Sequence, residues 1–269
     1  MLVVIKGAGD LASGIALRLY HAGFEIAMTE IASPLSVRWT VCFSQAVYKG
    51  SAQVEDVRAR LVKNKDEMPE AFSKREIAVF VDPDAAIVKE LKPLVLIDAI
   101  MAKRNTGTAI ADAPLVIGIG PGFSAGVDCH TVIETKRGHR LGRVITEGSA
   151  LPNTGVPGDI GGFTSERLLR SPADGLFRAI ASIGDFVKKG DIVALVEEIP
   201  LKAEIGGILR GILPSGIYVT RGMKAGDIDP RAERALCFTV SDKALAIGGG
   251  VLEAIMGSLG MGFLFQDRF

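Results

Sequence analysis

The stretch LVVIKGAGDLASG, residues 2–14, decides the fold that we expect. An apolar run of strand length leads into Gly7-Ala8-Gly9-Asp10-Leu11-Ala12, which matches the pattern GxGxxG/A with alanine at the third small position. In this pattern the first glycine permits a tight turn, the second lets backbone approach a phosphate, and the third small residue lets a helix pack on the strand. The amides at the start of that helix face the anion. The stretch therefore predicts a Rossmann-like nucleotide turn.

The residues after the turn continue this pattern. A helix is expected to end at Gly23, and Glu25–Thr29 has the composition of a second strand. Glu30 follows about twenty residues after the glycines, where an acid holds the hydroxyls of a ribose. This position favours NAD or another adenine-nucleotide-bearing cofactor over NADP. The alternative is a turn that persists as structure while its pocket is empty or holds another phosphate ligand.

Arg38 is a further candidate for ligand binding. It lies near the start of a helix expected over Val37–Tyr48. Its guanidinium group has the shape to bind a phosphate or carboxylate held beside Glu30. An ordinary surface arginine, or one that pairs with Glu30, is the alternative interpretation.

Further apolar runs predict a doubly wound parallel sheet. Ile77–Val81 and Leu94–Ile97 have strand length, and Asp84–Leu91 between them has helical spacing. Lys103 follows the second of these strands, at the carboxyl end where open α/β sheets bind ligands. It is a candidate catalytic or binding residue, with a solvated loop lysine as the alternative.

The run GPGFSAGVDCH, residues 120–130, follows an expected strand and is dense in permissive and reactive residues. Gly120 and Gly122 let backbone amides converge on a ligand. Asp128 and His130 would share one face of a strand and could act in proton transfer. Cys129 between them could be a tuned thiolate. The alternatives are a structural turn with a hydrogen-bonded histidine and a buried apolar cysteine, and no metal site is predicted.

The second half of the chain changes to short β segments separated by glycines. Two similar halves, 175–191 and 207–223, resemble the barrel-sandwich hybrid of biotinyl and lipoyl carrier domains. Lys202 is displaced from the carrier position, so a docking or lid module is favoured over covalent attachment there. The expected domains are a nucleotide-binding domain with a β arm, a β module and a segment that packs back on the first domain, at 1–165, 166–232 and 233–269.

Composition narrows the functional classes. Lys and Arg number 31 and Asp and Glu also number 31, so net charge gives no reason to expect a nucleic acid partner. The beginning MLVVIKGAGD does not have the pattern of a signal peptide, and no run of about eighteen apolar residues predicts a membrane helix. We expect a cytoplasmic protein, with a homodimer through the apolar residues Met261–Phe265.

Several motifs together support a resemblance over nearly the whole chain. They are GAGDLASG, GPGFSAGVDCH, RGHRLGRVI, NTGVPGDIGG, GILRGIL, KAGDIDPR and AIGGGVLEAI. With them the chain resembles the YqeB-type proteins, maturation factors of selenium-dependent molybdenum hydroxylases related to the XdhC/CoxI group. The resemblance implies a partner hydroxylase and a role with the molybdenum cofactor, for which a molybdopterin dinucleotide is one form of nucleotide ligand. It carries no catalytic residue over to this chain.

Three functions stay open at this point. The first is an accessory factor that binds a nucleotide-bearing cofactor through the Rossmann turn. The second is a free-standing NAD-dependent oxidoreductase, with residues 120–130 supplying proton chemistry. The third is a carrier modified on Lys202. The sequence leaves open whether the chain is an enzyme.

Overall fold

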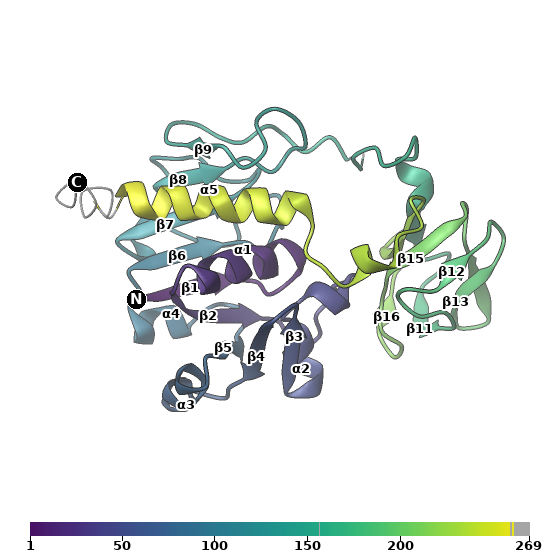
Figure 1. Ribbon diagram of the computed structural model, residues 1–269, viewed down its shortest axis with the longest axis horizontal. Coiled ribbons are helices and arrows are strands. Elements are labelled where there is room, and N and C mark those ends of the chain that lie inside the picture. The colour runs from purple at the N-terminus through teal and green to yellow at the C-terminus, as the bar shows by residue number, and fades with distance from the viewer. Residues whose placement is uncertain (156, 259, 261–269) are drawn as a thin grey trace. The chain divides into compact units, whose positions relative to one another are not determined.

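The computed structural model describes residues 1–155, 157–258 and 260 (Figure 1). The chain divides into two compact units, each of which we describe by itself. Unit 1 comprises Met1–Pro34, Phe43–Asn153 and Val240–Phe269, and unit 2 comprises Leu35–Cys42 and Thr154–Thr239. Each unit is thus built from segments that are distant in sequence.

A nine-stranded sheet is the centre of unit 1 in the described part of the chain, with the order β3-β4-β5-β2-β1-β6-β7-β8-β9. The strands are β1 (Leu2–Lys6), β2 (Glu25–Glu30), β3 (Ser51–Val54), β4 (Val57–Leu61), β5 (Ile77–Val81), β6 (Val95–Asp98), β7 (Leu115–Ile119), β8 (Thr131–Ile133) and β9 (Val144–Ile145). The strands from β4 to β8 pair in parallel, whereas β3–β4 and β8–β9 are antiparallel pairs at the two edges.

The predicted Rossmann-like doubly wound sheet is therefore wrong. The sheet is mixed, and only the β1–β2 connection is a long helix, α1 (Asp10–His21). The β6–β7 connection contains just a 3₁₀ turn at Ile110–Asp112. The helix expected over Val37–Tyr48 is a 3₁₀ turn and the short α2 (Gln45–Lys49), which ends because Gly50 adopts a φ of +76°.

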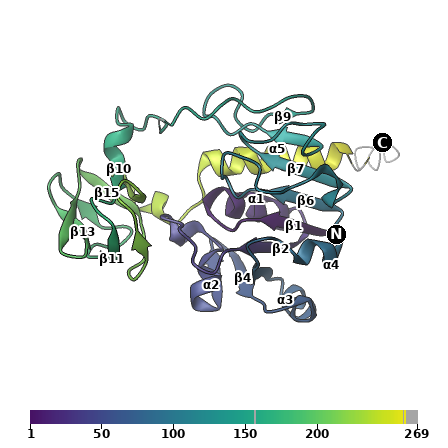
Figure 2. The same cartoon turned by 180° about the vertical axis from the view of Figure 1, so that it is seen from behind.

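Two helices from opposite ends of the chain lie side by side on one face of this sheet (Figures 1 and 2). They are α1 and α5 (Asp242–Ser258). The opposite face packs against α3 (Met68–Ser73) and α4 (Ile87–Leu91), with Val4 and Leu96 in the shared core. Side chains alternate along a strand, so Ile5 and Ile97, which are completely buried, point to the other face. Both faces of the central strands are therefore apolar.

Unit 2 contains two four-stranded antiparallel sheets in its described residues, with the orders β10-β17-β15-β12 and β14-β13-β11-β16. The strands are β10 (Leu168–Arg170), β11 (Gly175–Ala179), β12 (Phe186–Val187), β13 (Ile192–Val196), β14 (Ile199–Lys202), β15 (Gly207–Ile212), β16 (Tyr218–Val219) and β17 (Lys224–Asp229). The predicted biotinyl- or lipoyl-like module is wrong, because β10 and β17, which both lie outside the two similar halves, form one side of the first sheet with β15.

Two sequence predictions fall on residues that the structure does not fully describe. The apolar end Met261–Phe265, which suggested a homodimer, lies outside the described residues. The loop expected as a lid or linker, 153–162, includes Val156, which also lies outside them. Among the helices that the structure describes, none is long and apolar enough to span a membrane. A cytoplasmic location stays a prediction.

Candidate functional site

The glycine turn lies at the carboxyl edge of the unit 1 sheet, as its sequence predicts. Gly9 precedes the first turn of α1, which begins at Asp10. The glycines, however, make room for neighbouring backbone. A Cβ at Gly7 would lie 3.1 Å from the carbonyl oxygen of Ala99, and one at Gly122 would lie 2.6 Å from the amide nitrogen of Arg104. The loop that follows β6 therefore occupies the space that a bound phosphate group would need.

Glu30 also closes the turn. Its Oε2 accepts a hydrogen bond from the amide of Ala8 at 3.0 Å, and its Oε1 accepts one from Ile31 at 2.8 Å. Burial raises the pKa of Glu30, and the two amide hydrogen bonds only partly oppose that effect. The side chain expected to hold a ribose thus satisfies the amide expected to hold a phosphate.

A buried ionic group that the sequence analysis missed lies at the same edge. Lys6 Nζ donates a hydrogen bond of 2.6 Å to Thr108 Oγ1, which donates one of 2.6 Å to Asp98 Oδ2. Lys6 Nζ also lies 3.5 Å from Asp98 Oδ2, and the register pairs Lys6 of β1 with Asp98 of β6. These bonds satisfy the three groups, so we assign them to fixing the loop after β6. A lysine at the end of an apolar strand was the available signal.

The candidates at the end of the GPGFSAGVDCH run lie away from the glycine turn. The amide of His130 donates to Val116 O, and His130 Nδ1 accepts from the amide of Val116 at 2.9 Å, so His130 lies near the amino end of β7. Asp128 accepts a hydrogen bond from the amide of Ser124 and closes a turn. Cys129 is buried, and burial raises the pKa of its thiol to about 11. Such a thiol is not a thiolate at neutral pH.

The other candidates lie apart from one another. Gly120 follows β7 at the carboxyl edge, where a Cβ would lie 2.6 Å from Thr135 Oγ1. Lys103 is exposed in the loop beside Gly122, with a φ of +62°. Arg38 belongs to unit 2.

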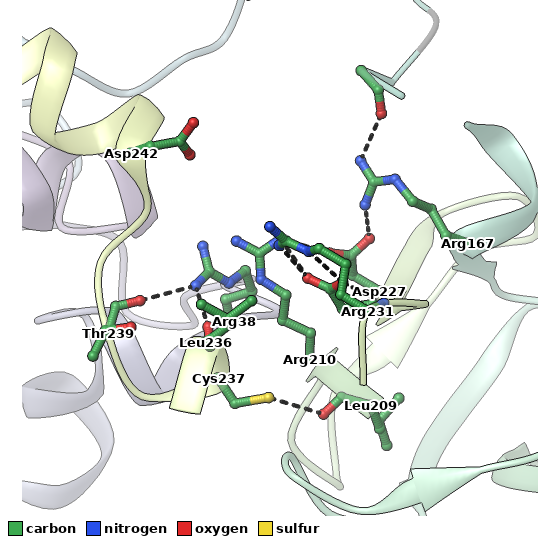
Figure 3. A network of polar contacts seen from close by, with 12 residues as sticks. Arg38, Arg167, Leu209, Arg210, Asp227, Arg231, Leu236, Cys237, Thr239 and Asp242 are labelled. Carbon is green, nitrogen blue, oxygen red and sulfur yellow. Dashed lines mark hydrogen bonds and ion pairs between the residues drawn. The ribbon is translucent and has the colours of Figure 1, made fainter. Parts of the chain in front are cut away.

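The densest set of buried charges in the described residues involves Arg38. We call this set the arginine cluster, and it comprises Arg38, Arg167, Arg210, Arg231, Asp227 and Asp229 (Figure 3). All of these residues belong to unit 2. Arg38 and Arg210 are only 5% and 8% exposed, and the side chain of Arg231 is 44% exposed. The cluster therefore reaches solvent at Arg231.

Strand geometry brings the cluster together. Asp227 and Asp229 are two residues apart on β17, so they share one face. The β15–β17 register shifts between Leu209 and Gly211, which makes Arg210 the extra residue of a β-bulge on the neighbouring strand. A bulge of this kind redirects a side chain, here towards both carboxylates, since Arg210 Nη1 lies 3.6 Å from Asp229 Oδ2 and 3.9 Å from Asp227 Oδ2.

A glycine explains how Arg38 reaches the same strand. A Cβ at Gly211 would lie 3.0 Å from Val37 O and 3.1 Å from Arg38 Cγ. The amide of Ile212 donates a hydrogen bond of 2.8 Å to Val37 O, which ties this segment to β15. Arg38 Nη2 then donates to the carbonyls of Leu236 and Thr239, both at 3.3 Å (Figure 3).

Arg231 and Arg167 hold the two carboxylates from the other sides. Arg231 donates from Nε and Nη2 to the two oxygens of Asp229, at 2.9 and 2.6 Å, and Arg167 pairs with Asp227. Burial alone would raise the pKa of Asp229, but hydrogen bonds from Arg231 and the charges of Arg231 and Arg210 outweigh burial and lower it. Four guanidinium groups against two carboxylates leave an excess of two positive charges.

The sequence analysis quoted the segments of this cluster without reading their charge. Arg210 interrupts the apolar and glycine run GILRGIL, and Asp227 and Asp229 interrupt a buried strand in KAGDIDPR. Charged residues within apolar strands were therefore the signal.

Comparison with curated proteins found one clear relative. Over 255 residues the chain is 54% identical to the uncharacterized protein YqeB of Escherichia coli strain K12. The chain is similar to YqeB. The match covers 95% of this chain and 47% of YqeB, so the chain spans about half the length of that relative. This finding confirms the predicted resemblance to YqeB, and it shows nothing of a role in hydroxylase maturation. No protein-family model matches the chain.

Solved structures give only distant likenesses. An aspartoacylase family protein from Mesorhizobium loti matches with a TM-score of 0.27 and 14% identity, over 84% of this chain and 83% of that one. A succinylglutamate desuccinylase/aspartoacylase from Rhodobacter sphaeroides matches with a TM-score of 0.27 and 13% identity, over 84% and 85%. At these scores the likeness assigns neither fold nor activity to this chain.

The predicted functions need correction all the same. The expected nucleotide-binding maturation factor and its alternative, an NAD-dependent oxidoreductase, are wrong. The solved structures that match carry aspartoacylase and desuccinylase names instead. The geometry agrees, because Glu30 and the loop after β6 fill the turn on which both predictions depended.

Proposed function

We propose that the chain binds a small, doubly charged anion of the phosphate class at the arginine cluster of unit 2. The observation that carries this proposal is the excess of two buried positive charges, made by four arginines around two aspartates. A buried charge without compensation is unfavourable, so such an excess favours an anionic ligand.

The chemistry of guanidinium selects the ligand class. Its planar set of N–H donors matches the oxygens of phosphate and carboxylate groups, and hydrogen bonds between ionised partners are about twice as strong as neutral ones. A phosphate monoester carries about −1.5 to −2 charges at neutral pH, which is close to the excess in the cluster. A single carboxylate would neutralise half of it.

The cluster is also held in place for binding. Arg210 sits in a β-bulge, and Arg38 packs over Gly211, so neither guanidinium group is carried on a mobile surface loop. Arg231, which is the most exposed arginine of the set, marks the side from which an anion enters. Preorganised donors of this kind lose little conformational entropy when they bind.

Isothermal titration calorimetry with inorganic phosphate at constant ionic strength tests the proposal. We expect saturable binding of one phosphate per chain and weaker binding of acetate, which carries one charge. Arg210→Gln removes one charged donor, worth about 1.5–3 kcal/mol, and should weaken phosphate binding by about 10- to 150-fold. Arg231→Gln provides a second variant at a half-exposed position, where folding is less affected.

The matched control is Arg178→Gln, an exposed arginine on β11 in the same unit. It removes the same charge away from the cluster and should leave phosphate affinity within about twofold, because exposed charges are largely screened. No saturable phosphate binding, or an equal loss for Arg178→Gln and Arg210→Gln, overturns the proposal.

A further inference from the structure

Two helix starts meet at the carboxyl edge of the unit 1 sheet, independently of the arginine cluster. A Cβ at Gly14 of α1 would lie only 2.5 Å from Cβ of Ala244 in the first turn of α5. The missing side chain at Gly14 therefore lets the two helices approach closely. Lys243 precedes Ala244 and lies within electrostatic range of Asp10, in the first turn of α1.

Charged groups surround Lys243 from every element that packs there. Asp10 comes from α1, Asp242 from α5 itself, and Glu134 and Arg137 from the chain that follows β8. Arg137 donates two hydrogen bonds to Asp242, at 2.6 and 2.8 Å. Glu134, which is 1% exposed, accepts hydrogen bonds from the amides of Lys136 and Leu151, so its carboxylate is fixed.

The surroundings favour the neutral amine. Burial is the largest influence and lowers the pKa of Lys243, and the charge of Arg137 lowers it further. Asp10, Glu134 and Asp242 act in the opposite direction without cancelling the decrease. The side chain is only half-buried, so small molecules can reach it. A lysine of this kind is a nucleophile near neutral pH.

We propose that Lys243 is a nucleophilic amine that forms an imine with the carbonyl group of a small aldehyde or ketone. The nitrogen lone pair adds to the carbonyl carbon while the C=O π bond breaks, and water carries the proton from nitrogen to oxygen. The resulting carbinolamine loses one water molecule and leaves a C=N bond. The step needs no oxidant or reductant, and hydrolysis reverses it.

Reductive trapping tests this proposal on the full chain. The protein is treated with propionaldehyde and sodium cyanoborohydride at pH 7, and peptide mass spectrometry measures the initial rate at each lysine. We expect Lys243 to be alkylated several times faster than Lys89, an exposed lysine of α4 that serves as the internal control. Each unit by which the pKa falls increases the free amine about tenfold.

Two variants give opposite signs. Arg137→Gln removes a positive charge and leaves Asp242 without that partner, so the pKa of Lys243 should increase and its trapping should slow. Asp10→Asn removes a negative charge, so trapping should be faster. Equal rates at Lys243 and Lys89, or no change of rate in Arg137→Gln, would show that Lys243 only stabilises the contact between α1 and α5.

Discussion

Substituting Asp229 by asparagine separates the stability of the arginine cluster from its capacity to bind anions. Asp229 is 1% exposed and accepts both hydrogen bonds of the Arg231 fork, while Arg210 lies 3.6 Å away. Asp229→Asn keeps the shape of the side chain and removes its charge. The excess of positive charge then rises from two to three.

The structure sets the size of the effect. Removing one partner of a buried ion pair costs about 3–5 kcal/mol, because the remaining charge is left without compensation. Asparagine retains one acceptor oxygen, and Arg231 is exposed enough to turn towards water. We therefore expect a loss of about 3 kcal/mol in the free energy of unfolding without phosphate. The same variant should bind phosphate more tightly than the unchanged protein, since a carboxylate that competes with the ligand has gone.

Urea unfolding followed by tryptophan fluorescence measures the loss. Trp39 is the one tryptophan of the sequence, and it packs against the core of unit 2, so its signal reports on that unit. Glu198→Gln, at an exposed position in the same unit, is the control with an equal change of charge. The reasoning is refuted if Asp229→Asn unfolds within 1 kcal/mol of the control, roughly the error of such measurements.

The pH dependence carries a sign that can be checked. The pKa of Asp229 is lower in the folded than in the unfolded protein, so folding favours its ionised form. Its stabilisation is present above the unfolded pKa, about 3.9, and is lost as the pH falls through the folded value. The difference between the unchanged protein and Asp229→Asn should therefore be constant from about pH 5 to 8 and shrink below about pH 4.

Three other outcomes follow from the described contacts. Gly250→Ala should destabilise unit 1 by about 2–3 kcal/mol in thermal melts, because its Cβ would collide with Gly142 O; Gly249→Ala has open space and should stabilise by about 0.5–1 kcal/mol. Cys129, with a pKa of about 11, should resist iodoacetamide at pH 8 until urea unfolds the protein, and rapid labelling of the folded chain would contradict its burial. Arg38→Gln should weaken phosphate binding by about 10-fold or more in calorimetry, and unchanged affinity would exclude Arg38 from the site.

Local sequence predicted local structure well in the first thirty residues. The strand, glycine turn, helix and second strand are present as β1, α1 and β2, because the apolar run, the glycines and helical spacing all act over short distances. The use of the turn was not predictable in the same way. Glu30 bonds the amide of Ala8, and the loop that fills the space beside Gly7 begins more than ninety residues later.

The arginine cluster was less accessible to sequence reasoning. It joins segments near residues 38, 167, 210 and 229, and the bulge that places Arg210 is a property of strand register. Arg38 was identified as an anion-binding residue from its chemistry, but its partners were sought near Glu30 instead of on β15. The expected cofactor, hydroxylase partner and homodimer stay predictions.

Crystals grown with tungstate, a heavy doubly charged analogue of phosphate, give the most direct test of the anion site. Anomalous scattering would locate the ion without reference to any expected position. Binding at the arginine cluster predicts a single strong peak within hydrogen-bond distance of the Arg38 and Arg210 guanidinium groups. A strong peak at the Gly7–Asp10 turn instead, or none near either arginine, would contradict it.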